Sequence, residues 1–162
     1  MKPVECLCNP KAGHEKEYRI KKTDTPLKVM VIGGGPAGMS AALAACERGH
    51  DVILFEKENR LGGQLYLAAA PPGREEFKQL AQDLAAQIAT HPIRVMLNVT
   101  VDENLLQREK PDRVILATGA KPMSPAIPGA DLPHVVQAWD VLLNKVFTGK
   151  RIAVIGGGSV GV

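Results

Sequence analysis

Apolar residues occur along this chain in short continuous runs, separated by glycine-rich or polar segments. Three of these runs, at 28–32, 51–55 and 113–117, contain mostly apolar side chains. Such uninterrupted runs are typical of strands that are buried on both faces of a parallel sheet, whereas a half-exposed strand would alternate apolar and polar residues. A fourth run, at 151–155, has the same character and predicts a further strand.

Two main helices are predicted between these runs. Residues 36–48 are rich in alanine, and Gly49 follows where the helix would need a C-terminal cap. A second helix should end near Thr90, because Pro92 cannot continue it. Its apolar residues lie on one face, at Phe77, Leu80, Leu84 and Ile88. The first strand, helix and second strand form a βαβ unit, whose crossover should be right-handed.

The remaining segments predict smaller elements and an extended lead-in. Short strands are expected at 93–97 and 99–101, with a brief polar helix after them, and a last helix is expected near 139–146. Residues 1–27 are polar, contain several prolines and show no periodicity.

These elements predict an α/β fold with a Rossmann-like parallel sheet, helices on its faces and small added strands. We divide the chain into a lead-in (1–27), the first part of a dinucleotide-binding domain (28–121), a linker with a helix (122–150) and the start of a second Rossmann-like domain (151–162). The strand at 151–155 has no crossover helix after it to cover it. We therefore expect the chain to be a fragment.

Composition narrows the classes of partner. The 162 residues carry a formal net charge of only +3, and the basic residues are scattered, so no nucleic-acid partner is indicated. No apolar run reaches about 18 residues, and the first residues are too polar for a signal peptide, so we expect a cytoplasmic protein without a membrane span. Three cysteines make an odd count, which argues against a secreted disulfide scaffold.

A glycine-rich turn supplies the first chemical motif. Residues 33–38 read GGGPAG and match G-x-G-x-x-G directly after a buried strand and directly before a helix. In this context Gly33 makes the tight turn, Gly35 lets the backbone approach a pyrophosphate, and Gly38 lets the helix pack close to the strand. The helix N-terminus then offers free N–H groups and a positive dipole end to the phosphates.

Glu56 completes this motif at the end of the second strand. It lies about 20 residues beyond the first glycine, where a carboxylate accepts hydrogen bonds from the ribose hydroxyls of an adenosine. The alternative is a glycine-rich turn followed by a surface glutamate. The strand, turn, helix and acidic residue together favour a dinucleotide site.

A second glycine turn occurs at 156–161, which read GGGSVG after the predicted strand at 151–155. Two such turns suggest two dinucleotides, which an enzyme needs when one cofactor hands electrons to the other. The alternative is a single nucleotide-binding domain followed by an unrelated glycine turn.

The order of these motifs resembles the two-dinucleotide-fold flavoprotein reductases, in which an NAD(P)H domain is inserted into an FAD domain. The resemblance rests on both glycine turns, Glu56, the LGGQ segment at 61–64 and the ATG segment at 117–119. It implies that Gly62, Gly63 and Gln64 lie near the ribityl and pyrophosphate groups of FAD, and that 117–119 mark the exit of the chain from the FAD domain.

A narrower resemblance covers the whole chain. The segments 2–10, 13–15, 62–65 and 71–72 are similar to the C-terminal portion of bacterial 2,4-dienoyl-CoA reductases, 2-enoate reductases and trimethylamine dehydrogenase. Those proteins begin with a barrel that binds FMN, followed by a segment that holds a [4Fe–4S] cluster. The resemblance implies that Cys6 is the last of four cluster ligands and that the other three, the FMN and the barrel belong to a longer protein.

The other cysteines are interpreted differently. Cys8 lies where the family has no ligand, and Cys46 lies within a predicted helix, where a small apolar role is favoured. Disulfide reductases share the fold but place a cysteine pair after the Gly-Gly turn. Residues 64–72 contain no cysteine, so disulfide reduction there is disfavoured.

The resemblance implies an electron-entry module. NAD(P)H would reduce FAD held by this segment, and electrons would pass through the cluster to FMN, where an activated C=C bond is reduced. We expect no catalytic acid or base in these residues and no activity of the fragment alone. One alternative is a structural ADP-binding module, as in trimethylamine dehydrogenase. Another is the FAD module of glutamate synthase-like enzymes, whose lead-in differs.

These interpretations give a defined set of site residues. Those expected to contact FAD are Gly33, Gly35, Pro36, Ala37, Gly38, Glu56, Lys57, Gly62, Gly63, Gln64, Val101, Ala117, Thr118 and Gly119, and those expected to contact NAD(P)H are Gly156, Gly158, Ser159, Val160 and Gly161.

Overall fold

A four-stranded parallel sheet forms the centre of the molecule. The structure is a computed structural model that describes residues 6, 9 and 11–158. The strands are β1 (Lys28–Ile32), β2 (Asp51–Phe55), β3 (Ile93–Met96) and β4 (Arg113–Leu116). They lie in the order β3-β2-β1-β4, and every pair is parallel, as the uninterrupted apolar runs predicted.

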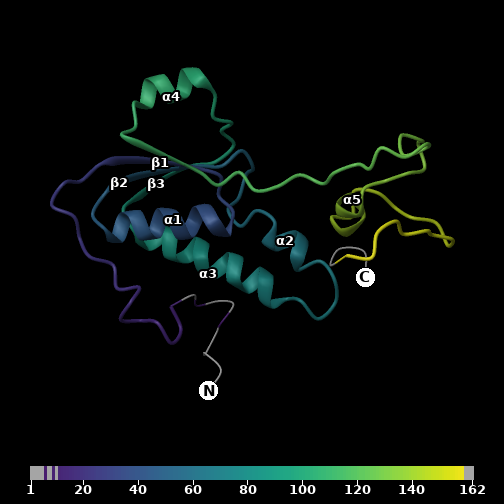
Figure 1. Cartoon of the computed structure of the whole chain (residues 1–162), viewed down its shortest axis with the longest axis horizontal. Helices are drawn as coiled ribbons and strands as arrows, with labels where there is room; N and C mark the ends of the chain where they lie inside the picture. Colours follow the sequence, from purple (N-terminus) through teal and green to yellow (C-terminus); the bar gives the residue numbers. More distant parts are fainter. Residues whose placement is uncertain (1–5, 7–8, 10, 159–162) are drawn as a thin grey trace.

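Two helices cover one face of this sheet (Figure 1). They are α1 (Pro36–Glu47), which ends one residue before the predicted helix, and α3 (Glu76–Thr90), which ends at Thr90 as expected. Gly49 lies in the left-handed region with φ of +92°, as its expected capping role requires. The core on this side contains the fully buried Val31, Met39 and Leu54.

The opposite face carries a thinner layer. Helix α4 (Glu103–Glu109) begins at Asp102, whose carboxylate accepts a hydrogen bond from the Leu105 amide at 2.8 Å. Leu105 packs over Met30 and Phe55 of the sheet. In Figure 1, α4 therefore lies on the other side of the sheet from α1 and α3.

The predicted strand at 151–155 is not present. Ile152, Val154 and Ile155 are exposed, and this segment forms no strand. A strand requires a hydrogen-bonded neighbour, and no strand between 11 and 158 lies beside it. Apolar character alone was therefore misleading at this segment.

Smaller elements also differ from the prediction. Residues 99–101 form no strand, because Asn98 turns the chain with φ of +57° and Val99 donates a single bond to the Glu56 carbonyl. The glycine- and proline-rich segment 61–73, whose composition predicts a loop, contains the short helix α2 (Leu65–Ala68). The last helix, α5 (Ala138–Leu142), is shorter than the expected 139–146.

The segments outside the sheet lie at its margins. The lead-in passes below α1 and α3 in Figure 1 and is joined to α1 by an ion pair of 3.7 Å between Lys11 and Glu47. After β4 the chain runs away from the sheet to a separate lobe that contains α5. Within the described ranges, no helix is long and apolar enough to cross a membrane.

Candidate dinucleotide-binding site

Three loops that follow neighbouring strands meet at the carboxyl edge of the sheet. The glycine turn 33–38 follows β1, the segment 56–64 follows β2, and 117–120 follows β4. Because β1 lies between β2 and β4, the glycine turn is flanked by the other two loops. In parallel α/β sheets, ligands bind at this edge, where the chain connections run to opposite sides.

The first and last glycines of the turn have no room for a side chain. A Cβ atom on Gly33 would lie 2.3 Å from the carbonyl oxygen of Ala117, and one on Gly38 would lie 1.8 Å from the carbonyl oxygen of Gly33. Gly33 also has φ of +110°, which strains any other residue. Both therefore provide the tight turn and the close helix packing that the motif predicts.

Gly35 differs from its neighbours because it borders open space. No atom lies within 4 Å of the position that a Cβ atom there would take. Gly35 is also the N-cap of α1, yet no side chain caps the helix and its first turn holds no acidic residue. Free helical N–H groups beside open space fit the pyrophosphate of a dinucleotide.

Glu56 is buried at the end of β2, with only 6% of its surface exposed. One carboxylate oxygen accepts the amide of Gly34 at 2.6 Å, and the other accepts the amide of Glu58 at 2.8 Å. The side chain thus holds the glycine turn in place. Each carboxylate oxygen has a second lone pair, so hydrogen bonds from ribose hydroxyls remain compatible with this arrangement.

The Gly-Gly turn packs directly against the first glycine turn. The Gly62 amide donates to the Gly34 carbonyl at 2.8 Å, and a Cβ atom on Gly63 would lie 2.9 Å from the Cα atom of Gly35. The family resemblance implied that the LGGQ segment lies near the first glycine turn, and the structure brings the two turns together.

A cation–π pair that the sequence does not reveal supports this turn. The Tyr66 ring would lie 2.5 Å from a Cβ atom on Gly62, and the Arg60 guanidinium stacks on the ring at 3.8 Å from its centroid. Arg60 and Tyr66 are six residues apart, whereas neighbours on a helix face are three or four apart. Only the tertiary fold therefore reveals the contact.

The exit loop after β4 forms the third wall. Ala117 contacts Gly33, whereas Thr118 and Gly119 are exposed. The side-chain amide of Gln64 donates to the Ala120 carbonyl at 2.9 Å and so connects this loop to the Gly-Gly turn.

Two residues of the expected set lie at the margin of this arrangement. Lys57 is exposed and forms an ion pair of 3.7 Å with Glu58. Val101 packs against the apolar layer beneath α4, together with Met30 and Phe55. Neither side chain contacts the glycine turn through a described interaction, so their roles toward a cofactor stay predictions.

The second glycine turn is described only in part. Gly156 has φ of +109°, which suits a tight turn, and Gly158 borders open space. Ser159, Val160 and Gly161 lie outside the described residues. The NAD(P)H contacts expected of this segment stay predictions.

The cysteines have distinct environments. Cys6 is exposed. Cys8 lies outside the described residues. Cys46 lies on α1 and packs against the core, as expected of a small apolar residue. Burial, and to a lesser degree the neighbouring Glu47 charge, raises the pKa of its thiol. No group of three or more metal-ligating side chains occurs in the part of the chain that the structure describes.

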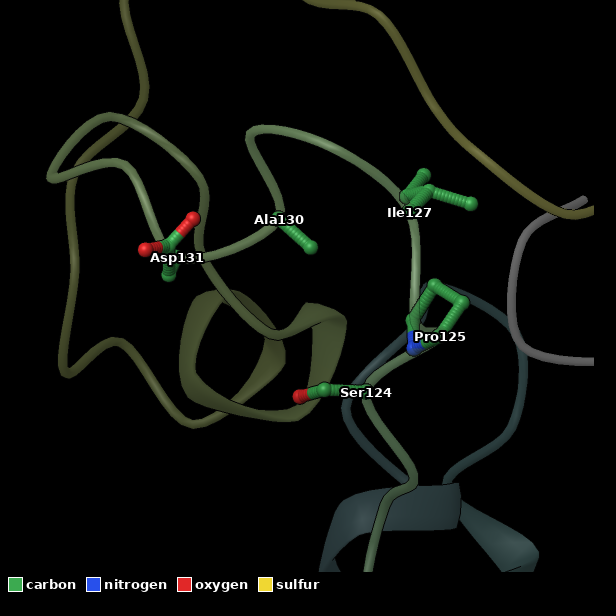
Figure 2. A pocket seen from close by; sticks show the side chains of 5 residues that line it. All are labelled: Ser124, Pro125, Ile127, Ala130 and Asp131. Atoms are coloured by element: carbon green, nitrogen blue, oxygen red, sulfur yellow. The ribbon is translucent and has the colours of Figure 1, made fainter.

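A separate cavity of about 360 Å³ lies in the lobe after β4 (Figure 2). Ser124, Pro125, Ile127, Ala130 and Asp131 line it. The Ser124 hydroxyl accepts a hydrogen bond from the Gln137 side chain at 2.8 Å. The cavity is thus formed by the loop 124–131, apart from the glycine turn.

The chain matches the family model described as pyridine nucleotide-disulphide oxidoreductase over residues 27–162. It is 47% identical to an NADH oxidase of Thermoanaerobacter brockii over 163 residues, which covers 98% of this chain and 25% of the relative. It is 43% identical to a metal reductase of Desulforamulus reducens, covering all of this chain and 25% of that protein. The chain therefore spans about a quarter of the length of these curated relatives.

A solved structure shows the same fold. The structure of 2-naphthoyl-CoA reductase in complex with 2-naphthoyl-CoA superposes with a TM-score of 0.90 at 35% sequence identity. The match covers 96% of this chain and 24% of that protein.

Proposed function

We propose, on the premise that this chain belongs to the pyridine nucleotide-disulphide oxidoreductase family, that it is the FAD-binding part of an NAD(P)H-linked flavoprotein. One observation carries the proposal: the uncapped N-terminus of α1 borders the open space at Gly35, with Glu56 at the end of the adjacent strand. When bound there, a flavin supplies the conversion of a two-electron hydride transfer into single-electron steps.

Different residues of this site bind different parts of the dinucleotide. The α1 N-terminus attracts the pyrophosphate through its free amides and dipole. Glu56 accepts the ribose hydroxyls of the adenosine half and would repel a 2′-phosphate, so FAD or ADP is favoured over NADP. No described residue is assigned as a catalytic acid or base, because the reacting atoms belong to the cofactors.

The proposed role in the whole protein is electron entry. NAD(P)H binds at the second glycine turn, and Cys6 supplies one ligand of a [4Fe–4S] cluster whose other ligands lie outside this chain. The terminal acceptor is FMN in a separate barrel, where an activated C=C bond of enoate or dienoyl-CoA type is reduced. Two observations support a module that is separate from the substrate site. The chain spans a quarter of the length of its relatives, and the names of two of them specify different acceptors, a metal and 2-naphthoyl-CoA.

Titration of the 162-residue chain with FAD, ADP and NADP⁺ by isothermal calorimetry tests the site. We expect FAD to bind more tightly than ADP and NADP⁺ to bind most weakly. Equal affinity for FAD and ADP would instead favour the structural ADP-binding module. Failure to bind either nucleotide would contradict the proposal.

The chain with FAD added should not oxidise NADH or NADPH at a measurable rate. The physical reason is that the segment before the second glycine turn forms no strand and leaves Ile155 exposed, so the nicotinamide site is not assembled in the described residues. Robust turnover in a spectrophotometric assay at 340 nm, the nicotinamide absorbance, would contradict this expectation.

The cluster assignment is tested in a longer protein that contains this segment. Cys6→Ala should lower iron per chain and stop electrons from reaching FMN, while reduction of FAD by NAD(P)H continues. Cys46→Ala is the matched control, because Cys46 packs in the core and should leave the iron content unchanged. Unchanged iron in the Cys6 variant would remove Cys6 from the cluster.

A further inference from the structure

We propose that Gln64 is a positioning residue. The hydrogen bond from its side-chain amide to the Ala120 carbonyl, here called the strap, crosses beside the glycine turn and sets the affinity of the site for the second half of a dinucleotide. The inference rests on the proposed nucleotide site and adds to it a residue that acts through the protein backbone. It follows from the place of Gln64 relative to the strand order.

The strap spans two loops that the sheet holds apart. Gln64 lies in the loop that follows β2, and Ala120 lies in the loop that follows β4. Since β1 lies between these strands, the bond of 2.9 Å between the Gln64 side-chain amide and the Ala120 carbonyl passes beside the glycine turn that follows β1. The two segments are 56 residues apart in the chain, so no local structure brings them together.

The surrounding geometry is arranged for this bond. Gln64 is the N-cap of α2, yet its side chain does not cap that helix and reaches the exit loop instead. Gly119 has φ of +72°, and a Cβ atom there would lie only 3.0 Å from the Gln64 side-chain nitrogen. Glycine at 119 therefore leaves the space that the carboxamide occupies and directs the next carbonyl toward it.

The strap lies on the side of the site that receives the second half of a dinucleotide. Glu56 ends β2 and marks the adenosine side. A dinucleotide crosses the sheet edge at the switch point, here between β1 and β4, so the part beyond the pyrophosphate lies toward the exit loop 117–120. Loss of the strap should therefore weaken FAD binding and leave ADP binding almost unchanged.

Calorimetric titration of the 162-residue chain with FAD and with ADP tests this difference. Gln64→Met keeps the side-chain length and removes the donor. We expect it to weaken FAD binding about three- to tenfold, as the loss of one net hydrogen bond implies, with less than a twofold change for ADP. Gln79→Met is the control, since Gln79 donates its side-chain bond to Asp83 on α3, away from the strap.

Gly119→Ala tests the same bond from the other side. Its Cβ atom would lie 3.0 Å from the carboxamide nitrogen, which must then move by a few tenths of an ångström and lengthen the bond to Ala120. FAD affinity should therefore fall in the same direction as in Gln64→Met, and the double variant should be no worse than Gln64→Met alone. Gly73→Ala is the matched control, because Gly73 has a similar φ of +77° and no atom within 4 Å of its Cβ position.

Three outcomes would overturn the inference. Equal losses for FAD and ADP would assign Gln64 a general structural role. Additive losses in the double variant would mean that Gln64 binds FAD directly and not through Ala120. Unchanged FAD affinity in Gln64→Met would contradict the role of the strap and leave the proposed function intact. A wild-type chain that binds neither nucleotide would contradict the proposed function itself.

Discussion

At the scale of single residues, Glu56 has two tasks within one site. Its carboxylate is buried and accepts two backbone amides, one of them from the glycine turn. A buried charge is stable only when such bonds replace its hydration. The residue therefore holds the turn in shape before any ribose hydroxyl reaches it.

Glu56→Gln should lower both stability and affinity. The amide group can accept from only one of the two backbone donors and places its own N–H₂ against the other. We expect a loss of about 1–3 kcal/mol in the free energy of unfolding and at least tenfold weaker binding of FAD. Urea titration and calorimetry measure the two effects. Glu58→Gln is the control, because that side chain is exposed, and equal values for Glu56→Gln and wild type would contradict the assignment.

Two glycines of the same turn should respond differently to alanine. Gly35→Ala meets no atom and should lose about 1 kcal/mol or less as an N-cap change, yet its methyl group would occupy the space beside the α1 N-terminus and abolish FAD binding. Gly38→Ala would place a methyl group 1.8 Å from a carbonyl oxygen and should prevent stable folding. Circular dichroism melting curves and FAD titration distinguish the two. A Gly35→Ala chain that binds FAD normally would show that the phosphates lie elsewhere.

At the scale of elements, a cluster of charged side chains connects α4 to strands β1 and β3 of the sheet. The Glu109 carboxylate at the end of α4 lies 3.0 Å from the Lys28 ammonium on β1 and 3.1 Å from the Arg94 guanidinium on β3. The hydrogen bond from Lys28 is the main cause that lowers the pKa of Glu109, with the nearby positive charges contributing further. This cluster joins three elements that are distant in sequence.

The lowered pKa of Glu109 predicts how this attachment depends on pH. A carboxyl group whose pKa is lower in the folded state stabilises the fold above its unfolded pKa, and that contribution is lost as the pH falls through the folded pKa. Glu109→Gln should thus lower the urea midpoint at pH 7 and reduce its decline toward pH 3. Glu103→Gln, on the same helix but bonded only to Gln107 among the described contacts, should retain the decline. Equal acid sensitivity of the Glu109 variant and the wild type would contradict this role.

At the scale of the whole molecule, large apolar side chains are exposed on the edge strand β4 and in the segment 151–155. Leu116 on the edge strand β4 is 74% exposed, and Ile155 in the segment before the second glycine turn is 73% exposed. Exposed apolar runs and unpaired strand edges favour association with other chains. The isolated chain should therefore self-associate as its concentration rises.

Val154→Lys should reduce this association. Val154 is exposed within the run 151–155, so a lysine there adds charge without disturbing the core, and the urea midpoint should not change. Sedimentation velocity over a range of concentrations measures the effect. Met123→Lys is the control, since Met123 is also exposed but lies outside the run. The same association in Val154→Lys and wild type would place the contact surface elsewhere.

The sequence by itself determined the parts that depend on local pattern. Uninterrupted apolar runs identified β1, β2 and β4. The runs of β1 and β2 match their burial on both faces, which tolerates few polar side chains, whereas β4 is an exposed edge strand despite the same pattern. The G-x-G-x-x-G spacing placed the turn between β1 and α1, since the steric demands at Gly33 and Gly38 are met within a few residues of chain.

Only the tertiary structure decided which distant segments meet. An apolar run at 151–155 forms no strand where a hydrogen-bonded partner is missing, and 99–101 follow a left-handed residue, Asn98, that periodicity does not reveal. Likewise, the strand order β3-β2-β1-β4 brings Gln64 to Ala120 across the glycine turn. Local patterns report the burial that a segment needs, whereas its hydrogen-bond partners depend on where the rest of the chain lies.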